Sequence, residues 1–267
     1  MLGAIIGDIV GSRFEFANYK FKDFELFHEN CHFTDDTVLT VAVADWLMSS
    51  DESVGHHLSR WTFKYPNCSY GAGYWRWVTS WDPKPYGSYG NGAAMRVSPV
   101  AWYGAKMNNV LYLADEVTKV THNHPEGVKG AQATALAIYL ARCGHPVSHI
   151  HLEIENRFGY NLNETVDQIR ERYRYNETCQ GTVPEAIACA LQATDFEDAI
   201  RNAVSIGGDS DTVAAIAGSV AEACFGIPDA HIEKIGDYLP DEMIAVVASF
   251  GETVVPVPEI GQSVSAA

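Results

Sequence analysis

Helical periodicity recurs along most of the chain and limits the fold more than any other feature of the sequence. Apolar or small side chains return at positions i, i+3, i+4 and i+7, and several of these segments end at Gly or Pro. Strand-like alternation does not accompany them. The sequence therefore predicts an all-α fold, with helices in the segments 37–50, 109–122, 127–144, 183–194, 196–208 and 211–226.

Small residues on these segments predict helix axes that approach closely in a compact bundle. Gly3, Gly7 and Gly11 recur every four residues and leave one smooth face on the first helical segment. A chain of 267 residues that is 47% hydrophobic can bury one large core. No linker divides it, so we expect one domain over residues 1–252 and a weakly ordered C-terminal tail over 253–267.

The segment from residue 65 to residue 99 interrupts the helical pattern. It is dense in Gly, Pro, Trp and Tyr and contains one short candidate helix. A long irregular segment in a compact domain is usually functional or disordered, and this aromatic content argues against disorder. For Trp75, Trp77 and Trp81, packing in the core or in a lid is favoured over stacking on a ligand.

Charge and cysteine usage narrow the classes of partner. With 18 basic and 34 acidic residues the chain carries a net charge of −16, so we expect no nonspecific nucleic-acid binding and no membrane association. The net charge does not exclude a local basic patch that binds one nucleotide. The six cysteines form no CxxC pair, and no signal peptide or membrane span is visible, which favours reduced thiols and a cytoplasmic protein. Nothing in the sequence indicates the oligomeric state.

Two short phrases place paired aspartates beside a threonine at the start of a predicted helix. They are FTDDT at 33–37 and GGDSDT at 207–212. One explanation is helix capping, because Ser, Thr and Asp are favoured N-caps and acidic groups stabilise the first turn. A cap needs one oxygen acceptor, which leaves the second aspartate of each pair unexplained. Together the two phrases favour a metal site built from both ends of the chain.

Carboxylates and threonine hydroxyls are hard oxygen ligands that suit Mg²⁺ or Mn²⁺ rather than zinc. Four carboxylates within about 4 to 6 Å repel by roughly 1 kcal/mol per pair in water, and divalent cations would remove that repulsion. Residues i and i+2 of a helix point about 200° apart. Asp209 and Asp211 therefore share an ion only if Asp209 lies before the helix, in a loop that Gly207 and Gly208 make flexible.

The signatures of several other enzyme classes do not occur in the sequence. There is no GxxxxGK[ST] phosphate loop, no GxSxG elbow and no extended GxGxxG. His122 and His124 lack the spacing of a zinc site, so they are not predicted as metal ligands. The phrase DSDTV loosely fits a phosphatase pattern, but that chemistry needs a buried strand before the first Asp, and SIGG is a poor strand.

Six motifs occur in an order that resembles the ADP-ribosylglycohydrolase family, which includes the dinitrogen-reductase-activating glycohydrolase and the ADP-ribosyl-acceptor hydrolases. They are GAIIGDIVGSRFE (3–15), FTDDT (33–37), YGAG (70–73), GSYGNGAAMR (87–96), THNHPEGVKGAQA (121–133) and GGDSDTVAAIAG (207–218). The resemblance implies an all-α, orthogonal multi-helix bundle. It also implies a centre of two Mg²⁺ or Mn²⁺ ions at the bottom of a cleft that takes ADP-ribose.

The resemblance also implies roles for individual residues. Glu15 and Asp35 would be catalytic, and either could accept the proton of the attacking water; the role of Asp8 stays open. The implied metal ligands are Thr34, Asp35, Asp36, Asp209, Asp211 and Thr212. The implied substrate-binding residues are Tyr70, Gly71, Ala72, Gly73, Ser88, Tyr89, Gly90, Asn91 and His122.

The function that follows is a divalent-metal-dependent hydrolase with an ADP-ribose-bearing substrate. It would cleave the glycosidic bond between ADP-ribose and a modified acceptor, which is a protein side chain, a nucleic acid or a small molecule. Two alternatives remain: a metal-dependent nucleotide or sugar phosphohydrolase, and a non-catalytic ADP-ribose-binding relative. The presence of all six implied ligands argues against the non-catalytic alternative.

Overall fold

The computed structural model describes residues 1–49 and 53–257. These residues form fourteen α-helices, one short 3-10 helix and no strand, which confirms the predicted all-α fold. The helices are α1 (Leu2–Ser12), α2 (Asp35–Met48), α3 (Val54–Lys64), α4 (Ala72–Val78), η1 (Asn91–Ala93), α5 (Ser98–Tyr103), α6 (Met107–Lys119), α7 (Pro125–Arg142), α8 (Val147–Phe158), α9 (Val166–Arg172), α10 (Cys179–Leu191), α11 (Phe196–Ser205), α12 (Ser210–Phe225), α13 (Asp229–Ile235) and α14 (Asp241–Thr253).

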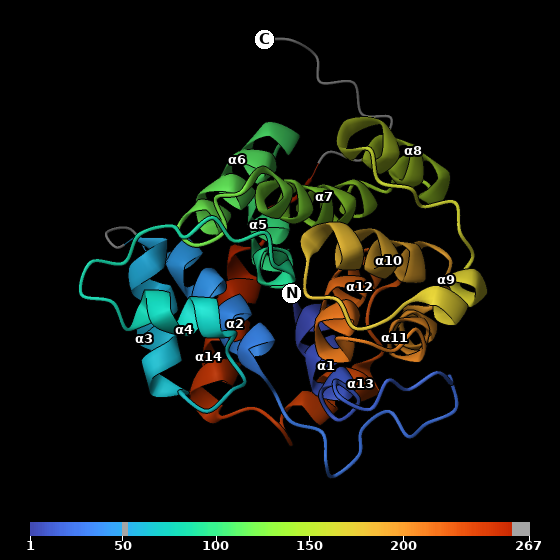
Figure 1. Ribbon diagram of the computed structural model, residues 1–267, viewed down its shortest axis with the longest axis horizontal. Helices are drawn as coiled ribbons and strands as arrows, with labels where there is room; N and C mark the ends of the chain where they lie inside the picture. Colours follow the sequence, from blue (N-terminus) through green and yellow to red (C-terminus); the bar gives the residue numbers. More distant parts are fainter. Residues whose placement is uncertain (50–52, 258–267) are drawn as a thin grey trace.

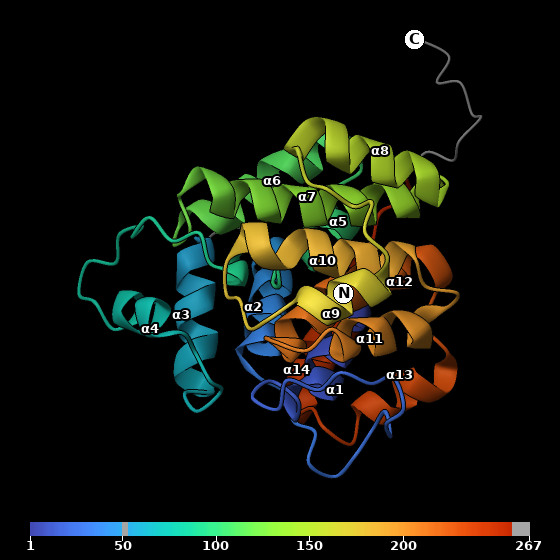
Figure 2. The same ribbon diagram turned by 45° about the vertical axis from the view of Figure 1, so that its right-hand side comes forward.

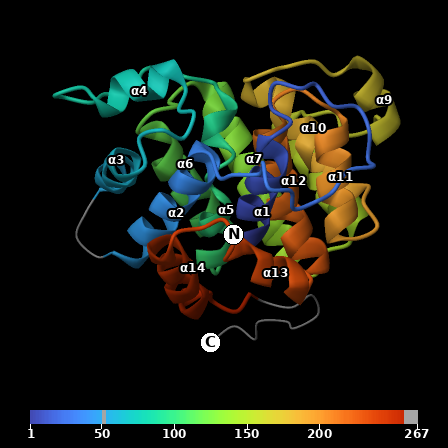
Figure 3. The ribbon, with the colours of Figure 1, turned by 90° about the horizontal axis from the view of Figure 1, so that it is seen from below.

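Helices α1 and α12 pack against each other in the interior of the bundle, although they come from opposite ends of the chain. Helices α2, α3 and α4 lie to one side of this pair and α9, α10 and α11 to the other (Figures 1 and 3). Figure 2 shows α7 above α10, and both of these helices pack against α12. This arrangement brings the beginnings of α2 and α12 together with the segment that follows α1.

The close approach of α1 and α12 follows from the glycine face predicted for the first helix. A Cβ atom on Gly7 would lie 2.0 Å from the carbonyl oxygen of Ala214, and one on Gly3 would lie 2.1 Å from that of Gly218. Only glycine fits at these positions, because real Cβ atoms do not approach a backbone oxygen so closely. The two helices run antiparallel, so the end of α1 meets the beginning of α12.

We expect Gly7→Ala to destabilise the protein by about 3 kcal/mol, because the new methyl group forces two backbones apart. Gly251→Ala on α14 is the matched control, since no atom lies within 4 Å of a Cβ built there and alanine is the better helix former. Thermal unfolding of the two variants measures the difference. Equal melting temperatures would contradict the close contact of α1 and α12.

The segment at 65–99 is largely irregular, as predicted, with α4, η1 and the first turn of α5 inside it. Trp77 is buried, which agrees with the predicted packing. The prediction is wrong for Trp81, whose side chain is fully exposed because it lies in a loop that the rest of the fold does not cover.

The end of the described chain lies against the bundle. Helix α14 reaches Thr253, and Arg142 then donates a 2.8 Å hydrogen bond from Nη2 to the carbonyl oxygen of Val255. Residues 258–267 of the predicted tail lie outside the described residues, and the boundary at residue 252 stays a prediction. None of the described helices combines the length and the apolar character needed to cross a membrane. The six cysteines are unpaired thiols.

Candidate active site

A cavity of about 450 Å³ opens where the beginnings of α2 and α12 meet. Its walls come from segments far apart in the sequence, including the end of the first glycine motif and the irregular segment. The residues that line it are Glu15, Asp35, Asp36, Leu39, Ser69, Gly71, Ala72, Gly73, Tyr74, Tyr86, Ser88, Gly90, Asn91, Gly92, Met95, Arg96, His122, Tyr175, Glu177, Asp209, Asp211 and Thr212.

The beginning of α12 has the geometry predicted for a shared ion. Gly207 and Gly208 have φ angles of 73° and 77°, a region that side chains with a Cβ rarely adopt. Asp209 follows with non-helical angles, immediately before the first residue of α12. Its side chain makes no capping hydrogen bond, so capping does not explain it. Instead Asn91 donates from Nδ2 to its Oδ2 at 2.6 Å and aims the carboxylate into the cavity.

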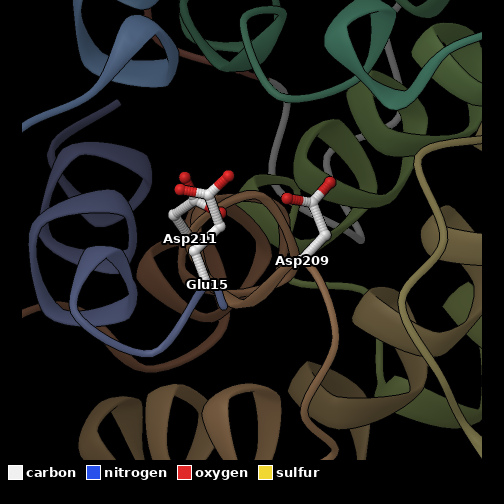
Figure 4. Close-up of side chains that lie close together, drawn as sticks. All are labelled: Glu15, Asp209 and Asp211. Atoms are coloured by element: carbon white, nitrogen blue, oxygen red, sulfur yellow. The ribbon is translucent and has the colours of Figure 1, made fainter. Parts of the chain in front are cut away.

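Three carboxyl groups converge at this point. Glu15, Asp209 and Asp211 each offer one oxygen atom, and these atoms lie within 4.8 Å of one another. Figure 4 shows the three side chains directed to the same side. Because α1 packs antiparallel to α12, Glu15, three positions beyond the end of α1, reaches the first turn of α12.

The beginning of α2 is held by a carboxylate from another helix. Asp8 on α1 accepts hydrogen bonds at Oδ2 from the backbone N–H groups of Thr34 and Thr37, at 2.9 and 3.0 Å. Its Oδ1 accepts from Thr34 Oγ1 at 2.7 Å. Thr34 also caps α2, accepting from Asp36 N at 3.3 Å, and it does not line the cavity. Asp8 therefore orients the first turn of α2, and the capping explanation holds for Thr34.

Asp35 and Asp36, the next two residues, both line the cavity. Asp36 accepts at Oδ1 a 3.3 Å hydrogen bond from Thr212 Oγ1, which joins the two aspartate phrases directly. Its other oxygen, Oδ2, is buried and has no hydrogen-bond partner among the described residues. A buried carboxylate oxygen without a partner is unfavourable unless a ligand satisfies it.

The carboxylates raise one another's pKa. Burial, and then the neighbouring acidic groups, hold the pKa values of Asp35, Asp36 and Asp211 well above the ordinary range. Burial, with the charges of Asp209 and Asp8, raises the pKa of Glu15 to about 7. Among the described residues that line the cavity, Arg96 carries the one guanidinium or ammonium group. This all-oxygen, uncompensated donor set fits a hard divalent cation.

Most of the implied substrate-binding residues line the same cavity. Gly71, Ala72, Gly73, Ser88, Gly90, Asn91 and His122 all line the cavity. The two tyrosines of the implied set do not. Tyr70 stacks on Tyr74 with ring centroids 5.6 Å apart, and Tyr89 is half exposed beside His124. Their assignment to substrate binding stays a prediction.

Several wall residues were missed by sequence reasoning. Met95 and Arg96 end the motif GSYGNGAAMR, so their position beside glycines that line the wall was a usable signal. Tyr175 and Glu177 lie in RYNETCQ, where nothing in the local sequence indicates a site.

The described residues thus define an all-α protein with an acidic, metal-compatible cavity between two helix beginnings. Residues 1–254 match the family described as ADP-ribosylglycohydrolase, and the chain belongs to that family. It is similar to ADP-ribosylhydrolase ARH3 of Homo sapiens, with 25% identity over 92% of this chain and 90% of that protein.

Two further similarities agree with this assignment. ADP-ribosylarginine hydrolase Tri1 of Pseudomonas putida is 26% identical, over 88% of this chain and 72% of its own length. A solved structure titled "ADP-ribosylglycohydrolase-related protein complex" superposes with a TM-score of 0.69 at 24% identity, covering 95% of this chain and 96% of that one. At this identity the solved structure supports the fold alone.

Proposed function

We propose that this protein is a divalent-metal-dependent hydrolase that cleaves the glycosidic bond between ADP-ribose and a modified acceptor. The observation that carries the proposal is that one cavity combines two sets of groups. Uncompensated carboxylates from both ends of the chain gather in it, and glycine backbone, His122 and Arg96 also line it. The carboxylates suit a cation and the sugar hydroxyls; the glycines, His122 and Arg96 suit a diphosphate.

Asp36, Asp209, Asp211 and Thr212, with Asp35 beside them, would hold one or two Mg²⁺ or Mn²⁺ ions. Thr34, whose hydroxyl bonds to Asp8 and caps α2, stays a predicted ligand. A bound ion of this kind supplies Lewis-acid chemistry, orienting the ribose hydroxyls and easing deprotonation of a water. Asn91 keeps the Asp209 carboxylate directed at the site, and Asp8 keeps the first turn of α2 in place.

Glu15 is the proposed general base. It is half-buried at the cavity wall, and its pKa of about 7 lies near the pH at which it would work, where proton transfer is most efficient. The water oxygen bonds to the anomeric carbon and its proton passes to the Glu15 carboxylate. The bond from that carbon to the acceptor breaks, and the electron pair leaves with the acceptor nitrogen or oxygen, which takes up a proton. The products are ADP-ribose and the free acceptor.

The glycines that line the cavity explain how a chain with a net charge of −16 could bind a nucleotide. Gly71 and Gly73 line the cavity at the beginning of α4, where no side chain caps the helix, so amide groups can approach phosphate oxygens closely. Arg96 also lines the cavity and adds a positive charge. The attraction is therefore local and needs no basic surface.

The test is an activity panel over ADP-ribose linked to arginine, to serine and to a nucleic-acid base, with EDTA as a control. We expect release of ADP-ribose in Mg²⁺ or Mn²⁺ and a loss of at least about 100-fold in EDTA. Phosphate release from nucleotides or sugar phosphates in place of ADP-ribose release would favour a phosphohydrolase. Tight ADP-ribose binding without turnover would favour a non-catalytic binder.

A further inference from the structure

A buried chain of hydrogen bonds runs from Arg96 to the cavity. Arg96 donates from Nη2 to the hydroxyl of Thr121 at 2.6 Å and to the carbonyl oxygen of Val117 at 3.1 Å. The same hydroxyl lies 2.7 Å from Nδ1 of His122. All three side chains are buried, and His122 reaches the cavity wall. The other ring nitrogen of His122, Nε2, faces Gly90 and Gly92, which also line the cavity: Cβ atoms built on them would lie 3.5 and 3.4 Å from it.

The lengths of these hydrogen bonds and the charge on Arg96 favour one direction for the proton of the Thr121 hydroxyl. Thr121 has one hydroxyl proton and already accepts a hydrogen bond from the guanidinium. Its remaining neighbours are Nδ1 of His122 at 2.7 Å and the carbonyl oxygen of Thr118 at 3.5 Å. The shorter contact is the better hydrogen bond, and a hydroxyl polarised by a guanidinium is a stronger donor. The Thr121 proton is therefore best placed toward Nδ1, with Nδ1 as the acceptor.

We propose that Arg96 and Thr121 are positioning residues that hold His122 as the imidazole protonated on Nε2, so that Nε2–H donates into the cavity. Resting on the proposed function, we assign the partner of this donor as a phosphoryl oxygen of the ADP-ribose group. Among residues 1–49 and 53–257, Nε2 has no hydrogen-bond partner in the protein, which leaves its N–H for the ligand.

Two further observations support the proposed protonation of His122 and the role of Arg96. Burial, and then the charge of Arg96, hold the pKa of His122 well below its ordinary range, so the ring is neutral and has a single N–H. Arg96 itself is fully buried, with Nε and Nη1 lacking partners among the described residues. A buried guanidinium with hydrogen-bond partners at only one of its three nitrogens destabilises the folded protein. Its effect on Thr121 and His122 gives a reason for its presence at this position.

The tautomer is measured directly by long-range ¹H–¹⁵N correlation spectra of the labelled full-length protein, with His122→Gln identifying the His122 signals. We expect Nδ1 at the position of an unprotonated nitrogen and Nε2 at that of a protonated one. Thr121→Val removes the hydroxyl with little change of shape and should abolish this preference. Thr121→Ser keeps the hydroxyl and should restore it. A proton on Nδ1 in the wild-type protein, or an unchanged spectrum in Thr121→Val, overturns the proposal.

The assignment of a phosphoryl oxygen as the partner of His122 Nε2–H is tested by calorimetric titration with ADP-ribose. We expect Kd to rise about five- to tenfold in Thr121→Val, the loss of about one oriented hydrogen bond, and to return in Thr121→Ser. An unchanged Kd in Thr121→Val overturns the assignment of the phosphoryl oxygen. If the wild-type protein binds no ADP-ribose, the proposed function and this ligand fail together, whereas the spectra still decide the tautomer.

Discussion

We expect Asp211→Asn to lower kcat by about 10³-fold, or about 4 kcal/mol, while raising the stability of the metal-free protein. The loss follows because Asp211 is one of the three carboxyl groups that converge at the beginning of α12. The gain follows because the substitution removes a buried charge that repels Asp36, Asp209 and Glu15. We expect about 1–2 kcal/mol of stabilisation in EDTA.

Steady-state kinetics in Mg²⁺ measure kcat, and thermal unfolding with and without Mg²⁺ measures the stability and the binding of the metal. The wild-type protein should be stabilised by Mg²⁺, and Asp211→Asn and Asp36→Asn should lose this response to a similar extent, because both belong to the same site. Asp115→Asn is the control. Asp115 pairs with Lys119 on α6, away from the cavity, so its loss should change stability by no more than about 0.5 kcal/mol. A full Mg²⁺ response in Asp211→Asn would mean that the metal binds without Asp211 and that Asp211 serves only the start of α12.

The second large effect is expected for Glu15→Gln. Removing a general base lowers kcat by about 10²- to 10⁴-fold, while the affinity for ADP-ribose and the Mg²⁺ response in thermal unfolding should stay. Asp35→Asn, measured in parallel, separates the two candidate bases. Glu177→Gln removes a charge from the same cavity and should cause a much smaller loss. If Glu15→Gln instead abolishes the Mg²⁺ response, Glu15 is a metal ligand and the base is Asp35.

The raised pKa of Glu15 also predicts how the metal-free protein responds to pH. The folded protein keeps this proton up to a pH of about 7, whereas the unfolded chain releases it near 4.5. Between these values the folded state binds more protons, so its stability is greatest at the acidic end and falls as the pH rises. The raised pKa values of Asp36 and Asp211 act in the same direction.

Denaturant unfolding in EDTA at several pH values measures how steeply the stability falls as the pH rises. Glu15→Gln should make this fall shallower, since the amide does not titrate, and Mg²⁺ should reduce it by compensating the charges. Stability that rises between pH 5 and pH 7 in EDTA would show that the carboxylates are already compensated inside the protein.

The local sequence contains the features that place Asp209 before its helix and bring α1 close to a neighbour. Gly207 and Gly208 adopt backbone angles available chiefly to glycine, which places Asp209 before the helix, as predicted. The spacing of Gly3, Gly7 and Gly11 predicted a close helix contact, and that contact forms. The partner of the glycine face, α12, was not predicted, because a smooth face does not say which helix lies on it.

The sequence by itself determined the helical class, the position of Asp209 before its helix, and the chemical character of the acidic donors, because periodicity, backbone freedom and ligand type belong to single residues and their neighbours. Only the tertiary structure decided that Asp8 holds the beginning of α2, that Tyr175 and Glu177 complete the wall, and that Arg96 reaches His122 through Thr121. These relations depend on the register in which distant helices pack. That register comes from the fit of all the core side chains together, which no short stretch of the sequence contains.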